Sequence, residues 1–179
     1  MVGRASSERS LTENGVMSAR VREIYVGHQR EAPMQFFRKI EAIAGKGLAG
    51  DRYAIGTGSY SKSKGIRDVT LIEIEDLWNF YRTSGTDLHP ALTRRNIVTE
   101  GIRLSDLVGS LFSIGSVTLL GLRPCPPCRH LAKLIGMPEV LHGLAHSGGI
   151  YAQVLSDGLI SINDPVVPSD ACMESAVKS

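Results

Sequence analysis

The chain has 179 residues, of which 42% are hydrophobic and 21% charged, and these values are typical of an ordinary folded domain. This length favours one domain with its own core. The formal net charge of +2 is too small to indicate a nucleic-acid or membrane surface, and no apolar run approaches the roughly 18 residues of a membrane span. Three cysteines do not make a secreted disulfide framework. We therefore expect a cytoplasmic protein with reduced thiols and with neither nucleic-acid nor membrane partners.

The ends of the chain lack an apolar period, so we expect a flexible leader over residues 1–16 and a flexible tail over 169–179 around a domain at 17–168. Within that domain, short apolar runs bounded by turn residues predict strands. A stretch rich in Gly, Ser and Lys, residues 56–65, predicts an exposed loop that would suit a lid. The predicted strands lie at 21–26, 34–43, 69–72, within 94–101, and at 111–114 and 117–122.

One helix is strongly indicated directly after the strand at 69–72. Ile74, Leu77, Trp78 and Tyr81 recur at helical spacing, which predicts an amphipathic helix with these side chains on its apolar face. Gly85 lies just beyond, as expected for a helix C-cap.

The last third of the domain predicts smaller elements. Residues 105–107 indicate one helical turn, residues 131–135 a short helix that ends at Gly136, and residues 139–146 a helix that opens after Pro138. The runs 151–155 and 159–162 predict a hairpin around the turn 156–158. Many short strands with few helices favour a mostly β, α+β fold, and we predict a β-barrel with short helices at its edges.

Several reactive and charged side chains lie close together directly after a predicted buried strand. They belong to the segment Arg123-Pro124-Cys125-Pro126-Pro127-Cys128-Arg129-His130. Three prolines make deep burial of the whole loop costly, because its remaining backbone groups need partners. The neighbouring positive charges favour a thiolate at Cys128, and a thiolate can carry sulfur as a persulfide or ligate a soft metal such as molybdenum. A thioredoxin-like pair is a minor alternative, because the surrounding strands predict a meander rather than a strand-helix-strand unit.

Zinc is a further alternative. Cys125, Cys128, His142 and His146 have the spacing C-x2-C-x13-H-x3-H, which lies within the range of zinc sites. Gly136 and the proline at 138 break the single helix that a zinc finger requires. A zinc-stabilised binding module without catalysis therefore stays open as a second function.

Other polar residues at the ends of predicted elements could complete an anion site. Guanidinium groups bind phosphate in a bidentate manner, and glycine loops let backbone amides approach it. Each residue could equally be an ordinary loop charge or a member of a structural ion pair. The candidates are Asp51, Arg52, Arg94, Arg95, Asn96 and His146.

Five segments in this order resemble the MOSC domain, the module named for the C-terminal region of molybdenum cofactor sulfurases. The resemblance extends over roughly residues 17–168. The segments are 45–53, 69–73, 94–102, 124–131 and 146–152.

This resemblance implies a β-barrel-rich fold and a cysteine that either carries sulfur or binds the metal of molybdenum cofactor (molybdopterin). Cys128 stands in the Pro-Cys position of the family, and Cys125 is a neighbour that we expect to resolve a persulfide as a disulfide. The residues Asp51, Arg52, Arg94, Arg95 and Asn96 match motif positions that border the same pocket.

The chain differs from full sulfurases, since it has no aminotransferase-like domain with a cofactor lysine and no reductase module. Pyridoxal phosphate is therefore not expected in this chain. Sulfur would come from a donor such as a cysteine desulfurase, or electrons from a reductase partner. A molybdenum-dependent reductase component acting on N-hydroxylated compounds is the alternative that the resemblance leaves open.

Overall fold

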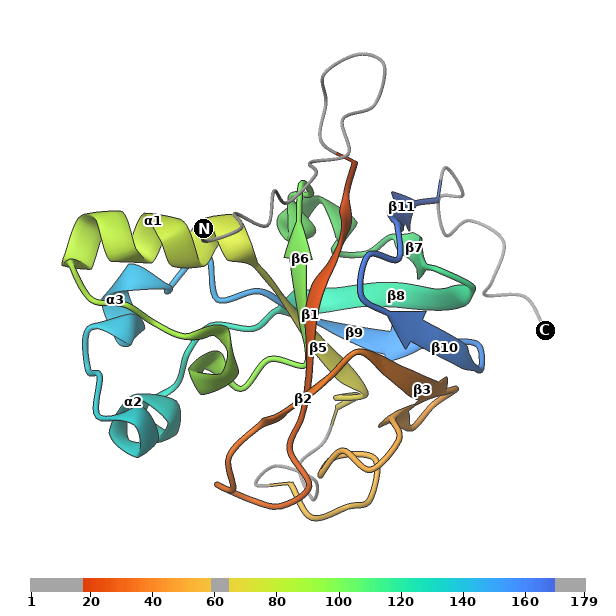
Figure 1. Cartoon of the computed structure of the whole chain (residues 1–179), viewed down its shortest axis with the longest axis horizontal. Helices are drawn as coiled ribbons and strands as arrows, with labels where there is room; N and C mark the ends of the chain where they lie inside the picture. Colours follow the sequence, from red (N-terminus) through yellow and green to blue (C-terminus); the bar gives the residue numbers. More distant parts are fainter. Residues whose placement is uncertain (1–17, 59–64, 170–179) are drawn as a thin grey trace, which may run out of the picture.

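The computed structural model describes residues 18–58 and 65–169, and its centre is a curled sheet of eight strands (Figure 1). The strand order is β11-β7-β8-β9-β5-β6-β1-β2. Only β5 and β6 run parallel among the paired strands of the described residues, joined by helix α1. The strands of this sheet are β1 (Arg20–Val26), β2 (Gln35–Phe37), β5 (Val69–Glu73), β6 (Ile97–Glu100), β7 (Leu111–Ile114), β8 (Val117–Pro124), β9 (Ile150–Val154) and β11 (Val166–Pro168).

A second, three-stranded sheet has the order β10-β3-β4. The helical elements are short, except for α1, and α1, α2 and α3 gather at one side of the molecule (Figure 1). The remaining elements are β3 (Lys39–Ile43), β4 (Gly47–Leu48), β10 (Gly158–Ser161), α1 (Ile74–Ser84), α2 (Arg129–Ile135), α3 (Val140–Gly143), and the 3-10 helices η1 (Pro90–Thr93) and η2 (Leu104–Leu107).

Strands β5 and β6 are buried at every position, which explains why their apolar residues do not alternate with exposed ones. Leu71 and Ile97 belong to a large core cluster shared by the two sheets, whereas Ile72 and Val98 pack in a smaller cluster with α1 and α3. A fully buried side chain of this kind contributes about 1.5–3 kcal/mol relative to an exposed one. These two strands therefore fix the middle of the molecule.

The prediction of a mostly β, α+β fold is confirmed, and most predicted strands lie where the sequence indicated. The loop at 45–53 contains the two-residue strand β4, and the run 34–43 divides into β2 and β3. Part of the proposed lid, residues 59–64, lies outside the described residues, as do 1–17 and 170–179. In the described ranges, no helix is long and apolar enough to cross a membrane.

The apolar face of α1 differs from the predicted one. The helix forms and ends at Gly85 in the left-handed conformation, as expected, but Trp78 and Tyr81 are 45% and 55% exposed. Phe80 is buried instead, and it packs so closely against Gly143 of α3 that a Cβ there would collide with its ring. The contact with α3 decides which face of α1 is buried. This contact cannot be predicted from the helical spacing of apolar residues in α1 alone.

The predicted hairpin at 151–162 is wrong, although both of its strands exist. Strand β9 pairs with β5 and β8, whereas β10 pairs with β3 in the other sheet. The turn between them is held by other elements: Ser156 Oγ accepts from the Thr118 amide at 2.9 Å, and Asp157 Oδ1 accepts from the Ala44 amide at 2.7 Å. These two hydrogen bonds fix the segment through which the chain passes from the eight-stranded sheet to the three-stranded sheet.

The predicted helix at 139–146 is also shorter than expected. Only Val140–Gly143 is helical, and the backbone leaves the helix at Leu144. His142 and His146 therefore do not share a face of one continuous helix, which removes the premise of the predicted zinc ligand pair.

Candidate functional site

A cavity of about 200 Å³ lies where the end of β8 and the start of β9 meet the loops before β2, after β4 and before β6. Two cysteines, five arginines and two tyrosines are among its lining residues. The lining is Glu31, Arg52, Tyr53, Arg67, Thr70, Arg94, Arg95, Arg123, Cys125, Pro126, Cys128, His130, Leu131 and Tyr151.

Cys125 lines this cavity but is only 2% exposed. Its amide donates to the Gly149 carbonyl at 2.8 Å, and its carbonyl accepts from Arg95 Nη2. The hydroxyl of Tyr151 is hydrogen-bonded to its side chain. Gly148 packs against the same segment, where a Cβ would lie 2.7 Å from the Cys125 carbonyl oxygen. The backbone and the side chain of Cys125 are therefore both fixed.

Cys128, in contrast, is exposed and stands at the N-cap of α2. Its Sγ accepts a hydrogen bond from the Leu131 amide at 3.5 Å, and its carbonyl accepts from the Ala132 amide at 3.0 Å. Cys128 therefore presents an accessible thiol at the wall of the cavity.

Arg94 supplies the cavity with a buried guanidinium nitrogen. Its backbone is left-handed, with φ of 60°, which is uncommon for a residue with a side chain. Nη1 donates to the Ala32 carbonyl at 2.7 Å, but Nη2 is buried without a hydrogen-bond partner among the described residues. Burial lowers the pKa of Arg94, and the positive charge of Arg52 lowers it further. This arrangement favours an anionic ligand.

Arg95 is tied into the protein more completely than Arg94. It is 8% exposed, and it donates to the carbonyls of Gly148 at 2.8 Å, of Thr93 at 3.1 Å and of Cys125. Its charge reaches the cavity, while its hydrogen bonds hold the two segments that carry Cys125 and Gly148. We therefore describe Arg95 as a residue that positions the cysteine loop.

Asp51 and Asn96 lie behind the cavity and do not line it. The Asp51 carboxylate accepts from Asn96 Nδ2 at 3.0 Å and from Arg52 Nη1 at 3.4 Å, as well as from backbone amides. Asn96 in turn accepts from the amide and hydroxyl of Thr70. This buried network holds the guanidinium group of Arg52, which lines the cavity and whose Cζ lies 4.9 Å from the ring centroid of Tyr53.

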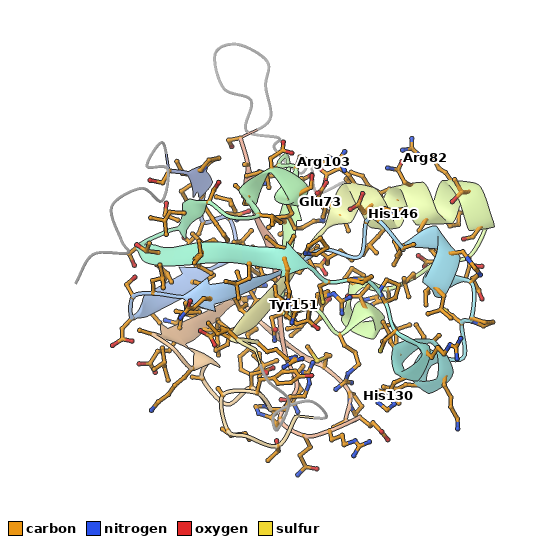
Figure 2. All side chains as sticks on the ribbon, turned by 180° about the vertical axis from the view of Figure 1, so that it is seen from behind. Glu73, Arg82, Arg103, His130, His146 and Tyr151 are labelled. Carbon is orange, nitrogen blue, oxygen red and sulfur yellow. The ribbon has the colours of Figure 1, made fainter. Side chains whose placement is uncertain are left out.

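His146 is the one predicted site residue that lies apart from this group. It is absent from the cavity lining and stands in the loop between α3 and β9. Figure 2 labels both His146 and Tyr151 and shows them well separated. In the described part of the chain, no group of three or more His, Cys, Asp or Glu side chains could hold a metal ion. The predicted zinc set of two cysteines and two histidines is therefore not assembled.

The sequence indicates Arg123 only as a positive charge beside the cysteines, and it gives no sign that its neighbour Tyr151 belongs to the site. Arg123 pairs with Tyr151 across β8 and β9, and its Cζ lies 3.9 Å from the ring centroid. Burial raises the pKa of Tyr151 to about 12, and its interaction with Cys125 adds to this rise. The correct pairing of β9 with β8, instead of the hairpin with β10, would have placed these two residues together.

The mouth of the cavity also holds an acidic residue. Glu31, whose backbone φ is 62°, lies 3.3 Å from His130 Nε2 on α2, and His130 is two residues from Cys128. The negative charge of Glu31 is one of the interactions that favour the charged form of Arg94. The loop between β1 and β2 thus contributes a carboxylate to an otherwise basic cavity.

Solved structures with the same fold include three proteins that are similar to this chain at low sequence identity. The YUAD protein from Bacillus subtilis has a TM-score of 0.71 and 18% identity, covering 87% of this chain and 98% of that one. YiiM from Escherichia coli has a TM-score of 0.64 and 18% identity, covering 87% and 71%. YiiM from Geobacillus stearothermophilus has a TM-score of 0.63 and 17% identity, covering 85% and 75%.

No curated protein sequence matches the chain. The model of the MOSC domain, however, matches residues 66–167, which is more than half of the sequence. This range includes both cysteines of the cavity, Tyr151 and four of the five arginines that line it, all except Arg52. With the predicted fold observed and the family model matched over this range, the chain belongs to the MOSC domain family.

Proposed function

We propose that the cavity binds molybdenum cofactor and that Cys128 provides the thiol that carries sulfur to it or ligates its molybdenum. The single observation that supports this most is Arg94 Nη2, which is buried without a hydrogen-bond partner among the described residues, in a cavity that also presents an exposed thiol. A buried donor without a partner costs free energy, and an anion in the cavity would remove that cost.

The residues of the cavity fit such a ligand. Guanidinium groups bind phosphate with two parallel hydrogen bonds, and molybdopterin carries a phosphate. Arg94 Nη2 has no hydrogen-bond partner among the described residues, and Arg123 is exposed with its guanidinium carbon over the ring of Tyr151. A thiolate is a soft ligand of the kind that molybdenum accepts. Bound molybdenum would supply redox and sulfur-transfer chemistry at this position.

The residues of the cavity would have separate roles in binding the cofactor. Arg94 and Arg52 would hold the phosphate, with Arg52 kept in place by the buried carboxylate of Asp51. Arg95 would hold the cysteine loop in register with β9. Cys128, as a thiolate, would present its sulfur toward the cavity, where the cation-rich wall stabilises negative charge.

The test is to purify the full chain from a molybdenum-replete host and to measure molybdenum by elemental analysis and pterin by fluorescence after oxidation. Arg94→Gln should lower the retained pterin about tenfold, the effect of losing one charged hydrogen bond. Arg129→Gln is the matched control, because it removes the same charge from an exposed residue next to Cys128 that does not line the cavity. It should behave as the unmodified chain.

The role of the thiol is read from Cys128→Ala. If Cys128 carries sulfur, a cysteine desulfurase supplied with cysteine should add one sulfur atom to Cys128 of the unmodified chain. The Cys128→Ala variant should lack this added sulfur atom. If Cys128 ligates metal, the variant should retain pterin and lose molybdenum. The proposal fails if the unmodified chain contains neither pterin nor molybdenum and Cys128→Ala equals it in every cofactor and persulfide assay.

A further inference from the structure

The two cysteines of the cavity are held apart by the backbone between them. The peptide bonds before Pro126 and Pro127 are trans, and residues 125–128, all described, contain neither turn nor bend. Cys128 is extended, with φ of −115° and ψ of 163°. Proline fixes φ near the polyproline value, and a residue before proline is driven to the same extended region.

An extended proline segment is too long for a disulfide between its ends. At about 3.1 Å per residue, three steps separate the Cα atoms of Cys125 and Cys128 by about 9 Å. A disulfide requires Cα atoms roughly 4.4–6.8 Å apart. The C-x2-C spacing, which permits a disulfide where the chain turns at a helix start, does not permit one across this segment without a change of backbone conformation.

Both ends of the segment are anchored against that change. The Cys125 amide bonds to Gly149, its carbonyl to Arg95, and its side chain to Tyr151. At the other end, the Cys128 carbonyl opens α2 through its bond to Ala132. Closing the disulfide would break several of these hydrogen bonds, each worth about 0.5–1.5 kcal/mol.

The surroundings of Cys128 select the charge of whatever reacts with it. Of the described residues that line the cavity, five are arginines and one, Glu31, is acidic. A cavity with such an excess of cations attracts negative molecules and repels positive ones. The buried Nη2 of Arg94 adds a hydrogen-bond donor for a carboxylate.

We infer that Cys128 is a modification site for small disulfides that carry carboxylates, and that the mixed disulfide persists because Cys125 cannot displace it. This inference stands on the segment 125–128 and the arginines, and it does not depend on binding of molybdenum cofactor. It also assigns Cys125 a packing role in place of the resolving role that the sequence suggested.

The reaction is a thiol-disulfide exchange that needs no other oxidant. The Cys128 thiolate attacks one sulfur of the small disulfide, a bond forms between Sγ and that sulfur, and the original S–S bond breaks. The leaving half departs as a thiolate with the electron pair and takes up a proton from water. Cys128 is thereby oxidised to a mixed disulfide, and one half of the reagent is reduced to a free thiol.

The experiment uses the full chain with Cys172 replaced by Ser, so that only the two cavity thiols remain. Oxidised glutathione is the acidic probe, and intact-mass spectrometry follows the product after the excess reagent is removed. We expect one glutathionyl group, mapped to Cys128 by peptide analysis, with no decay over hours. A product two hydrogen atoms lighter than the reduced chain, which is the internal disulfide, would overturn the inference.

Charge selection is measured with cystamine, a small disulfide with two ammonium groups. Each rate at Cys128 is divided by the rate of the same reagent with N-acetylcysteine methyl ester, which removes the intrinsic reactivity of the reagent. The normalised rate for oxidised glutathione should exceed that for cystamine by at least about 10-fold at low salt and should approach it at high salt. A smaller preference, or one that salt does not change, would overturn the selection by the arginines.

Discussion

The guanidinium carbon of Arg123 lies 3.9 Å from the ring centroid of Tyr151, so a cation covers the face of the aromatic ring whose hydroxyl bonds to Cys125. Cation–π contacts of this kind contribute about 0.5–2 kcal/mol. The contact joins β8 to β9 at the cavity, and it links the exposed basic surface to the buried thiol. Tyr151 is therefore held from both sides.

Tyr151→Phe should keep the ring under Arg123 and remove only the hydrogen bond to Cys125. We expect the free energy of unfolding to fall by about 1 kcal/mol, the net value of one buried hydrogen bond. Urea denaturation measures the change. Tyr81→Phe, which alters a 55% exposed ring on α1, should leave stability unchanged within about 0.5 kcal/mol. Equal losses in both variants would show that the Tyr151 hydroxyl is not specifically bonded.

Asp51→Ala should destabilise the protein strongly. The change leaves the amides of Gly27 and Tyr53, the Asn96 side chain and the charge of Arg52 without their common acceptor. Breaking a buried ion pair by removing one partner costs about 3–5 kcal/mol.

The matched control for this change is Asp87→Ala, because Asp87 is exposed. Thermal unfolding followed by circular dichroism should separate the two variants by at least about 6 °C, given about 2–4 °C per kcal/mol for a domain of 150–250 residues. Similar melting temperatures would mean that the hydrogen bonds and the ion pair of Asp51 do not stabilise the protein.

Gly149→Ala should prevent stable folding. Gly149 has φ of 88°, and a Cβ at this position would collide with the carbonyl oxygen of Leu71 on β5. Gly85 has a similar φ of 70° but open space around it, so Gly85→Ala should cost only about 1 kcal/mol. Soluble yield and melting temperature distinguish the two, and a folded Gly149→Ala variant as stable as Gly85→Ala would contradict the close approach of β9 to β5.

Stability should fall as the pH rises, because Glu73 is buried. Burial raises the pKa of Glu73 from 4.5 to about 7 in the folded protein, although its hydrogen bond from Leu104 and its ion pair with Arg103, which Figure 2 labels beside it, act in the opposite direction. The folded state therefore binds this proton more tightly than the unfolded state. Its contribution to stability is fully present below pH 4.5 and is lost as the pH rises through about 7.

Glu73→Gln tests this dependence, since glutamine mimics the protonated carboxyl and still accepts from the Leu104 amide. The free energy of unfolding of the unmodified chain, minus that of the variant, should decrease between pH 5 and pH 8. Glu41→Gln is the matched control, because it makes the same substitution at an exposed residue. An increase in the Glu73 difference over the same interval would reverse the assigned direction of the pKa shift.

The sequence predicted most strands because short apolar runs between turn residues are a local signal. It failed where a long-range contact decides: Phe80 is buried because α3 lies against it, and β9 pairs with β8 because Ser156 and Asp157 bond outside their own turn. Arg52, Arg94 and Arg95 lie in loops with a recognisable sequence pattern, whereas Arg123 lies on β8. Tyr151 has no such local signal, since its position depends on the register between two strands.

The exposed position of Trp78 has a practical consequence for spectroscopy. It is the one tryptophan of the chain and belongs to α1, where the guanidinium of Arg22 from β1 lies over its ring. It does not line the cavity of the cysteines. Its emission should therefore follow the docking of α1 on β1 and should be insensitive to a ligand that fills the cavity without moving that helix. Fluorescence titrations of this protein are better read from an extrinsic probe near Cys128 than from its own indole.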